Sequence, residues 1–179
     1  MRELTGIESD DELWRRWLTC RWVRTFERGE CTPAEFAAGV VSDWELTVEP
    51  EVFLETFRNW PVGALPGAEA LVDSVRQVTA VGCLSNTNFL HTEEHFSRWP
   101  IFDAFDHRFL SHELGLLKPD REVFDRVAEL VGSPPGRILF LDDNVMNVDG
   151  ATDAGFSALH VRGVAETERA LTGAGILGG

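Results

Sequence analysis

Cationic residues are scarce in this sequence. It has 16 Lys and Arg against 30 Asp and Glu, which gives a formal net charge of -14 at pH 7. Proteins that bind nucleic acids hold the phosphates with clustered Lys and Arg, so this charge argues against a nucleic-acid partner. The charge also works against anionic small molecules, and any phosphate site must therefore create its own local positive field.

Long apolar runs and cysteines are also few. No run approaches the length that spans a membrane, and the first residues, MRELTGIESDDELW, lack the apolar centre of a signal peptide. The three cysteines, Cys20, Cys31 and Cys83, are an odd and sparse set, which is typical of a reducing compartment. These absences predict a cytoplasmic protein with no membrane contact.

The N-terminal part of the chain has the apolar spacing of helices only. Apolar residues recur at helical intervals from Asp10 to Gly29, with Asp10 or Asp11 as the expected cap. Thr32 and Pro33 begin a second helix, and EPEVFLETFRNW predicts a third. The break PVGALPG follows. We therefore expect a helical domain over residues 1–62 and a second domain over residues 63–179.

Beyond this break, short apolar runs alternate with helical stretches. The expected strands are Val78–Ser85, His107–Ser111, Arg137–Asp143 and Ser157–Val161, and the expected helices are Phe89–Trp99, Arg121–Val131, Val145–Ala154 and Val164–Ala174. Strands joined by helices of this length pair in parallel, so the pattern predicts an α/β fold with a doubly wound parallel sheet. Ligands bind at the carboxyl ends of such strands.

Three motifs place polar and charged groups at these strand ends. LSNTN ends the first strand with Ser85 and Asn86, LGLLKPDREVF carries Lys118, and FLDDN ends another strand with Asp142 and Asp143. Hydroxyl and backbone N–H groups hold phosphate oxygens, a lysine neutralises charge and carboxylates hold Mg²⁺, as phosphoryl transfer requires. Each motif alone also fits an ordinary role: a helix cap, a solvated loop lysine, or a turn with an N-cap.

With these motifs in this order, the sequence resembles the haloacid-dehalogenase-like (HAD) hydrolase superfamily. The resemblance extends over nearly the whole chain, through LSNTN, FLSHELGLLKP and FLDDN..NVDGA. It is similar to the subfamily with a helical cap inserted after the first core strand, which includes small sugar-phosphate phosphatases. The resemblance implies a Rossmann-like core, with residues 1–62 as a cap that closes over the site.

The resemblance also implies roles for single residues. Ser85 and Asn86 would bind the transferred phosphoryl group, and Lys118 would stabilise its charge and the nucleophile. Asp142 and Asp143 would hold Mg²⁺, with Asn147 in support of that loop. The dehalogenating branch of the family lacks the two aspartates, so LDDN favours a Mg²⁺-dependent phosphatase that acts on a small phosphorylated metabolite.

One motif of the family has no counterpart in this sequence. It is an apolar strand ahead of the cap that ends in Asp-x-Asp, whose first aspartate is the nucleophile and whose second is the general acid/base. MRELTGIESDD contains no apolar run. In the family this strand lies in the middle of the sheet, between the strands that would end here at Ser85 and Asp142. We therefore expect a missing core strand and failure of covalent catalysis.

Three explanations of this absence stay open. The natural protein is longer and starts upstream, or the chain is a catalytically dead HAD-like binding or scaffold protein. In the third, the sheet is rearranged, or a partner or a second copy of the chain donates the strand, as in a homodimer.

Two further patterns have competing interpretations. His91 and His95 in HTEEH share one helical face and match a short zinc-peptidase pattern, but also fit an interdomain helix with two ordinary histidines. Arg21, Arg24 and Arg28 either face the site or are solvated.

Overall fold

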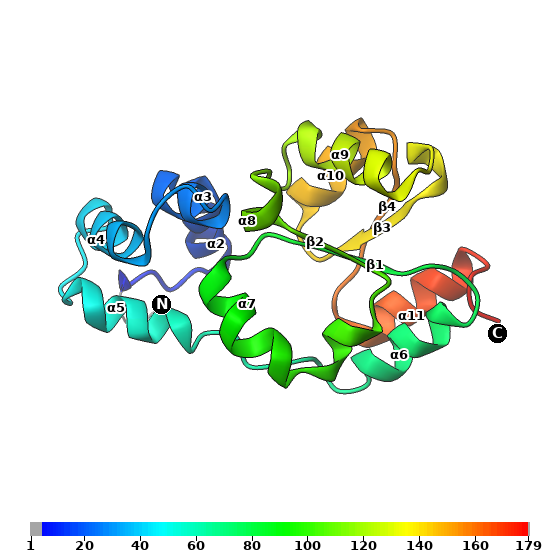
Figure 1. Ribbon diagram of the computed structural model, residues 1–179, viewed down its shortest axis with the longest axis horizontal. Helices are drawn as coiled ribbons and strands as arrows, with labels where there is room; N and C mark the ends of the chain where they lie inside the picture. The colour runs from blue at the N-terminus through cyan, green and yellow to red at the C-terminus, as the bar shows by residue number, and fades with distance from the viewer. Residues whose placement is uncertain (1–4, 179) are drawn as a thin grey trace.

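The chain has an N-terminal helical region and a region that contains strands. The computed structural model describes residues 5–178, apart from the side chains of residues 10, 11 and 97. The helical region consists of α2 (Asp10–Thr19), α3 (Arg21–Glu27), α4 (Pro33–Asp43) and α5 (Pro50–Arg58). Figure 1 shows these helices, blue to cyan, at one end of the molecule. No described helix is long and apolar enough to cross a membrane.

The single helix predicted from Asp10 to Gly29 is instead two helices. Cys20, between α2 and α3, has an extended backbone with φ -66° and ψ 123°. This break lets both helices turn apolar residues toward one core, with Trp17 from α2 and Val23 from α3 buried there. The N-cap of α2 is Ser9, whose side chain accepts a hydrogen bond from the Glu12 N–H, rather than Asp10 or Asp11.

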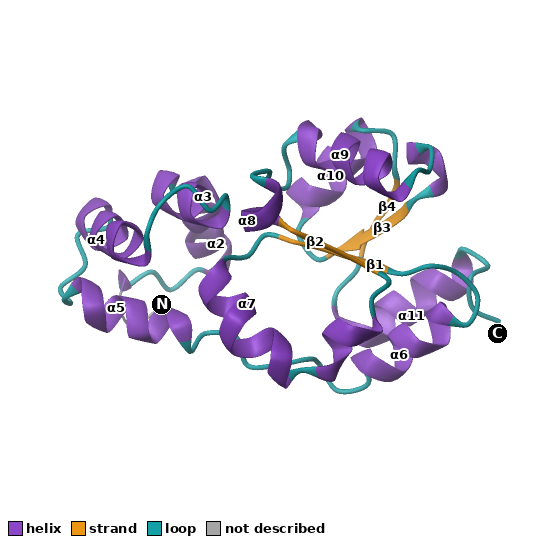
Figure 2. Cartoon of the chain, viewed as in Figure 1, coloured by secondary structure: helices purple, strands orange, loops and turns teal. Residues whose placement is uncertain are grey.

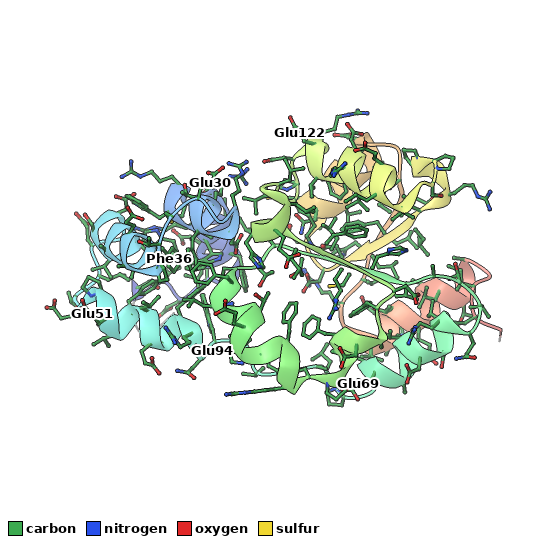
Figure 3. All side chains as sticks on the ribbon, in the orientation of Figure 1. Glu30, Phe36, Glu51, Glu69, Glu94 and Glu122 are labelled. Atoms are coloured by element: carbon green, nitrogen blue, oxygen red, sulfur yellow. The ribbon has the colours of Figure 1, made fainter. Side chains whose placement is uncertain are left out.

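The second helix begins where the sequence predicts. Thr32 is its N-cap, Pro33 stands in the first turn, and Thr32 and Glu35 exchange the reciprocal hydrogen bonds of a capping box. Behind this start, Phe36 is fully buried and stacks on Phe26 with ring centroids 4.4 Å apart. Figure 3 labels Phe36 in the interior of the helical region. The aromatic residues of this region are therefore mainly its core.

The strands pair in parallel, as the α/β prediction requires. β1 (Gly82–Ser85) pairs with β2 (His107–Leu110), and β3 (Leu139–Asp142) pairs with β4 (Ser157–His160). The two pairs are separate sheets: in the described part of the chain, no backbone hydrogen bond joins β1 to β3. Figure 2 shows both pairs, in orange, between the surrounding helices. A continuous doubly wound sheet is thus not formed by the described strands alone.

Helices cover the strands on both sides. The remaining α-helices are α6 (Ala68–Arg76), α7 (Phe89–His95), α8 (Ser111–Leu114), α9 (Arg121–Val131), α10 (Val145–Asp153) and α11 (Gly163–Gly173), and short 3-10 turns lie at Phe96–Arg98, Pro100–Ala104 and Pro135–Arg137. In Figure 1, α9 and α10 lie on one side of the strands and α6 and α11 on the other. Phe124 from α9 packs on Phe140 of β3 and on Phe156. Helix α6 was not predicted from the sequence.

Helix α7 connects the two regions. His91 and His95 each place Nε2 2.8 Å from a carbonyl oxygen at the end of α5, those of Phe57 and Arg58 respectively. Leu90, also on α7, is buried in the core of the helical region. The HTEEH segment therefore lies at the contact between the regions, which fits the interpretation as an interdomain helix. The boundary at residues 62 and 63 remains a prediction.

Candidate active site

The strand ends bring three predicted segments together. β1 ends at Ser85 and β3 ends at Asp142, while Lys118 lies between α8 and α9. Side-chain hydrogen bonds join the segments, because Asn86 contacts the Lys118 backbone and Lys118 contacts Asp142. This is the carboxyl edge of the strands, where the fold class places ligands.

Asn86 fixes the backbone of Lys118. Its Nδ2 donates to the Lys118 carbonyl oxygen at 2.9 Å, and the Lys118 N–H donates to its Oδ1 at 2.9 Å. Both ends of the side-chain amide are therefore engaged, although the sequence predicted Asn86 as a phosphate ligand. The backbone N–H of Asn86 makes no hydrogen bond to a described residue. It is therefore the group of Asn86 that is available to bind an anion.

Lys118 and Asp142 form a buried ion pair. Lys118 Nζ lies 2.7 Å from Asp142 Oδ2, and the two side chains are only 11% and 7% exposed. Lys118 is also the only lysine in the sequence. Removal of one partner from such a pair leaves an uncompensated buried charge, so each residue needs the other unless a ligand replaces it.

The second oxygen of Asp142 is held by its own loop. Asp142 Oδ1 accepts hydrogen bonds from the Asn144 N–H at 2.8 Å and from Asn147 Nδ2 at 3.0 Å. Asn144 also caps α10, since its Oδ1 accepts from the Met146 N–H at 3.0 Å. These bonds hold the carboxylate at the end of β3 with Oδ2 directed toward Lys118.

Ser85 and Asp143 have free side chains. Ser85 is partly buried and Asp143 is exposed, and neither side chain makes a hydrogen bond to another described residue. The N-cap of α7 is Asn88, whose side chain accepts from the His91 N–H at 3.1 Å. The alternative in which Ser85 caps the next helix is therefore wrong, and its hydroxyl is available to a ligand.

Sequence reasoning missed Ser111 and Thr87. The Ser111 hydroxyl donates to the Thr87 carbonyl oxygen and accepts from the Thr87 N–H, both at 2.9 Å. Both residues are buried, so this pair fixes the loop that follows Ser85. The available signal was the position of Ser111 directly after β2, which parallels that of Ser85 at the end of β1.

Helix α3 carries charged residues toward the Lys118 segment. Arg24 and Arg28 place their Nη2 atoms 2.6 and 2.8 Å from the same oxygen of Asp120. Arg21 instead pairs with Asp43 within the helical region. Arg24 and Arg28 therefore contact the segment that carries Lys118, whereas Arg21 points to another part of the helical region.

Comparison with known proteins identifies the family. A model of the haloacid dehalogenase-like hydrolases matches residues 21–155. The chain belongs to this family. Pyrimidine 5'-nucleotidase YjjG of Escherichia coli is 29% identical over an alignment of 143 residues, and the match covers 76% of this chain. The chain spans 63% of the length of that relative.

Solved structures of HAD-like proteins have the same fold. A HAD family enzyme of Bacteroides thetaiotaomicron, crystallised with magnesium and inorganic phosphate, is 25% identical with a TM-score of 0.68 over 84% of this chain and 80% of its own. A predicted HAD-like hydrolase of Porphyromonas gingivalis is 20% identical with a TM-score of 0.72 over 97% and 86%. At this identity the second protein supports the fold alone.

The residues of this HAD-like chain fit part of a magnesium site. Mg²⁺ commonly binds through one or two protein carboxylates, with substrate phosphate and water as its other ligands. Asp142 and Asp143 follow one another at the end of β3 and supply two carboxylates. Within the described residues, no cluster of three or more His, Cys, Asp or Glu could surround a metal ion. The donor set therefore suits a Mg²⁺ ion that is bound together with a phosphate.

Proposed function

We propose that this site binds a small phosphorylated metabolite together with Mg²⁺, as in a HAD-like phosphoric monoester hydrolase. The observation that carries the proposal is the hydrogen-bonded chain from Asn86 through Lys118 to Asp142. It joins three sequence motifs at one edge of the strands. The magnesium and phosphate in the Bacteroides structure support the same pair of ligands here.

The proposed roles use the free groups of the site together with the ion pair of Lys118 and Asp142, whose mutual contact the ligands would replace. The Ser85 hydroxyl and the Asn86 N–H donate to phosphate oxygens, and the Lys118 ammonium neutralises their charge. Asp142 and Asp143 would hold Mg²⁺, with Asn147 as the support of Asp142. When bound, the ion would neutralise charge that develops on the phosphoryl group. Asn86 acts as a positioning residue, because its amide is committed to the Lys118 backbone.

A covalent step lacks its nucleophile in these residues. The sequence contains no Asp-x-Asp at any position, and β1 and β3 are not paired with each other in the described chain. We therefore propose that the 179 residues bind phosphate but form no phosphoaspartate. A strand that carries the nucleophile would have to come from outside them.

A binding or scaffold protein is the second candidate function. The two hydrogen bonds from Asn86 to the Lys118 backbone and the free Ser85 hydroxyl suit ligand binding as well as they suit catalysis. The name of the nucleotidase relative makes pyrimidine 5'-nucleotides a candidate ligand class for either function. A second copy of the chain or a strand-donating partner is the proposed protein partner.

Phosphate binding is tested through the single lysine. Protein labelled with [¹⁵N]lysine gives one backbone amide signal, from Lys118, whose N–H is bonded to Asn86. Titration with inorganic phosphate and Mg²⁺ should shift this signal, and isothermal titration calorimetry should show binding that Lys118→Met abolishes. Arg126→Met, which removes an exposed cation on α9, is the control and should bind normally. Binding that survives Lys118→Met would refute the proposed site.

Catalysis is tested separately. With Mg²⁺ and a panel of phosphate monoesters that includes nucleoside monophosphates, the purified 179-residue chain should show little or no release of phosphate. Robust Mg²⁺-dependent turnover that Lys118→Met removes would refute the proposed absence of a nucleophile, while the binding site would stand.

A further inference from the structure

The last turn of α3 and the residues after it contact the region that contains the strands, close to Lys118. Arg24 and Arg28 hold Asp120, two residues after Lys118, at 2.6 and 2.8 Å. Gly29 is so close to the core that a Cβ atom on it would lie 2.8 Å from the His112 carbonyl oxygen. The helical region therefore places this turn against the segment that carries the proposed phosphate-binding lysine.

Glu27 is the charged residue of this turn that has no partner. It follows Arg24 by three residues on α3, is partly buried, and makes no hydrogen bond to another described residue. The cations that act on its carboxyl are Arg24 and Lys118. Its oxygens are not among the described polar atoms that are fully buried without a hydrogen-bond partner, so they keep some contact with solvent.

The lysine and the arginines around Glu27 are paired with other residues. Arg24 and Arg28 are bonded to Asp120, and Lys118 is bonded to Asp142. On α8, His112 places Nε2 3.5 Å from the Thr92 hydroxyl, while its Nδ1 is buried and has no hydrogen-bond partner among the described residues. Glu113 is exposed to solvent. On the side of the site formed by α3, Glu27 is thus the partly buried carboxyl that makes no hydrogen bond to a described residue.

We propose that Glu27 selects the ligand, by accepting a hydrogen bond from a hydroxyl or amino group of the part of the molecule beyond its phosphate. The proposal rests on phosphate binding at Lys118, which brings that part of the ligand to α3. Partly buried carboxyls are normally hydrogen-bonded, and a donor on the ligand supplies the partner that the chain does not. The ligand class is a phosphate monoester of a small polyol or amino alcohol.

The charge of Glu27 limits the class of phosphate esters that the site should bind. Burial raises its pKa to about 7, against the lowering effect of Arg24 and Lys118. Above this pH the carboxylate favours a cationic amino group and repels a second anion on the ligand. Esters with a second phosphate or a carboxylate close to the first phosphate should therefore be rejected.

The test compares ligands of matched size by calorimetry. Inorganic phosphate reports on Lys118 alone, propyl phosphate adds a chain without donors, and glycerol 1-phosphate adds the same chain with two hydroxyl groups. Wild type should bind glycerol 1-phosphate at least about tenfold more tightly than propyl phosphate. Glu27→Ala should reduce this ratio to about one and leave inorganic phosphate binding intact or stronger.

Two variants separate the ligand contact from a general effect. Glu27→Gln keeps an acceptor oxygen without the charge, so it should retain the preference for glycerol 1-phosphate but lose a preference for 2-aminoethyl phosphate at about pH 8. Glu30→Gln, three residues further on at an exposed position that Figure 3 labels, should behave as wild type. If Glu27→Ala keeps the wild-type ratio, the inference on Glu27 is wrong and the phosphate site stands. If wild type binds neither inorganic phosphate nor the esters, both proposals are wrong.

Discussion

Lys118 is held by hydrogen bonds at both its backbone and its side chain. Asn86 binds the backbone N–H and carbonyl, and Asp142 binds Nζ. A lysine side chain loses much conformational entropy when it is fixed in one position. Because Lys118 is already ordered before a ligand binds, the entropic cost of binding is lower. At the scale of single residues, the site is thus organised around the position of one ammonium group.

Asn86→Ala should weaken phosphate binding without removing a proposed phosphate ligand. The variant loses two hydrogen bonds of 2.9 Å to the Lys118 backbone and keeps its own backbone N–H. We expect about a tenfold rise in the dissociation constant for inorganic phosphate and a loss of about 1–3 kcal/mol in the free energy of unfolding. Calorimetry and urea denaturation measure the two effects. Asn59→Ala, which removes an exposed amide at the end of α5, is the control; equal phosphate affinity in the two variants would contradict the positioning role.

At the scale of elements, α3 and α8 meet at one of the contacts between the helical region and the region that contains the strands. Gly29, just after α3, has φ +74° and approaches the His112 carbonyl oxygen. Glycine is the residue that adopts this φ without steric cost, and it leaves no Cβ to separate the two elements. The ion pairs of Arg24 and Arg28 with Asp120 lie beside this close backbone contact between Gly29 and His112.

Gly29→Ala should disrupt this contact. The new Cβ would lie 2.8 Å from the His112 oxygen, so the cost exceeds that of the φ angle alone. Gly132→Ala is the matched control, because Gly132 has φ +67° and a Cβ atom added to it would meet nothing within 4 Å. We expect Gly29→Ala to lower the free energy of unfolding by about 1–3 kcal/mol more than Gly132→Ala, as measured by urea denaturation. Equal losses would indicate that α3 and α8 separate easily.

The sequence predicted elements where a local signal defines them. The capping box at Thr32 and the bounds Arg121–Val131 of α9 are confirmed. The break at Cys20 was missed, because apolar spacing continues across it and only the shared core requires the turn. The candidate site residues at the strand ends were predicted from their motifs, and their roles stay predictions. The commitment of Asn86 to Lys118 and the position of Glu27 depend on contacts between distant segments, which no local pattern reports.

At the scale of the whole molecule, two apolar clusters divide the chain. One lies among the helices α2 to α5 with Leu90 of α7, and the other lies between the strands and α9 and α10. The Lys118 segment, with Arg24, Glu27 and Arg28, is where the two parts meet in charged groups. A carboxyl left unpaired there lowers the stability of the whole fold, and the proposed ligand contact gives a reason for its presence.

Glu27→Gln should therefore stabilise the protein, and more so at higher pH. The pKa of Glu27 is raised from 4.5 to about 7 in the folded chain, chiefly by burial, so the folded state holds this proton more tightly than the unfolded state. The contribution of this bound proton to the stability of the fold is fully present below about pH 4.5 and is lost as the pH rises through about 7. Between about pH 5.5 and 8.5, the stability of Glu27→Gln relative to wild type should rise by about 2 kcal/mol.

Urea denaturation of both proteins across this pH range measures the difference. Burial lowers the pKa values of His91 and His112, which makes stability rise with pH, but both histidines are present in both proteins and cancel in the difference. Glu30→Gln removes one negative charge at an exposed position and corrects for the net charge of -14. Because the proposed ligand forms a hydrogen bond with Glu27, saturating glycerol 1-phosphate should stabilise wild type more than it stabilises Glu27→Ala. A constant difference across the pH range would show that the Glu27 carboxyl is solvated in the folded chain.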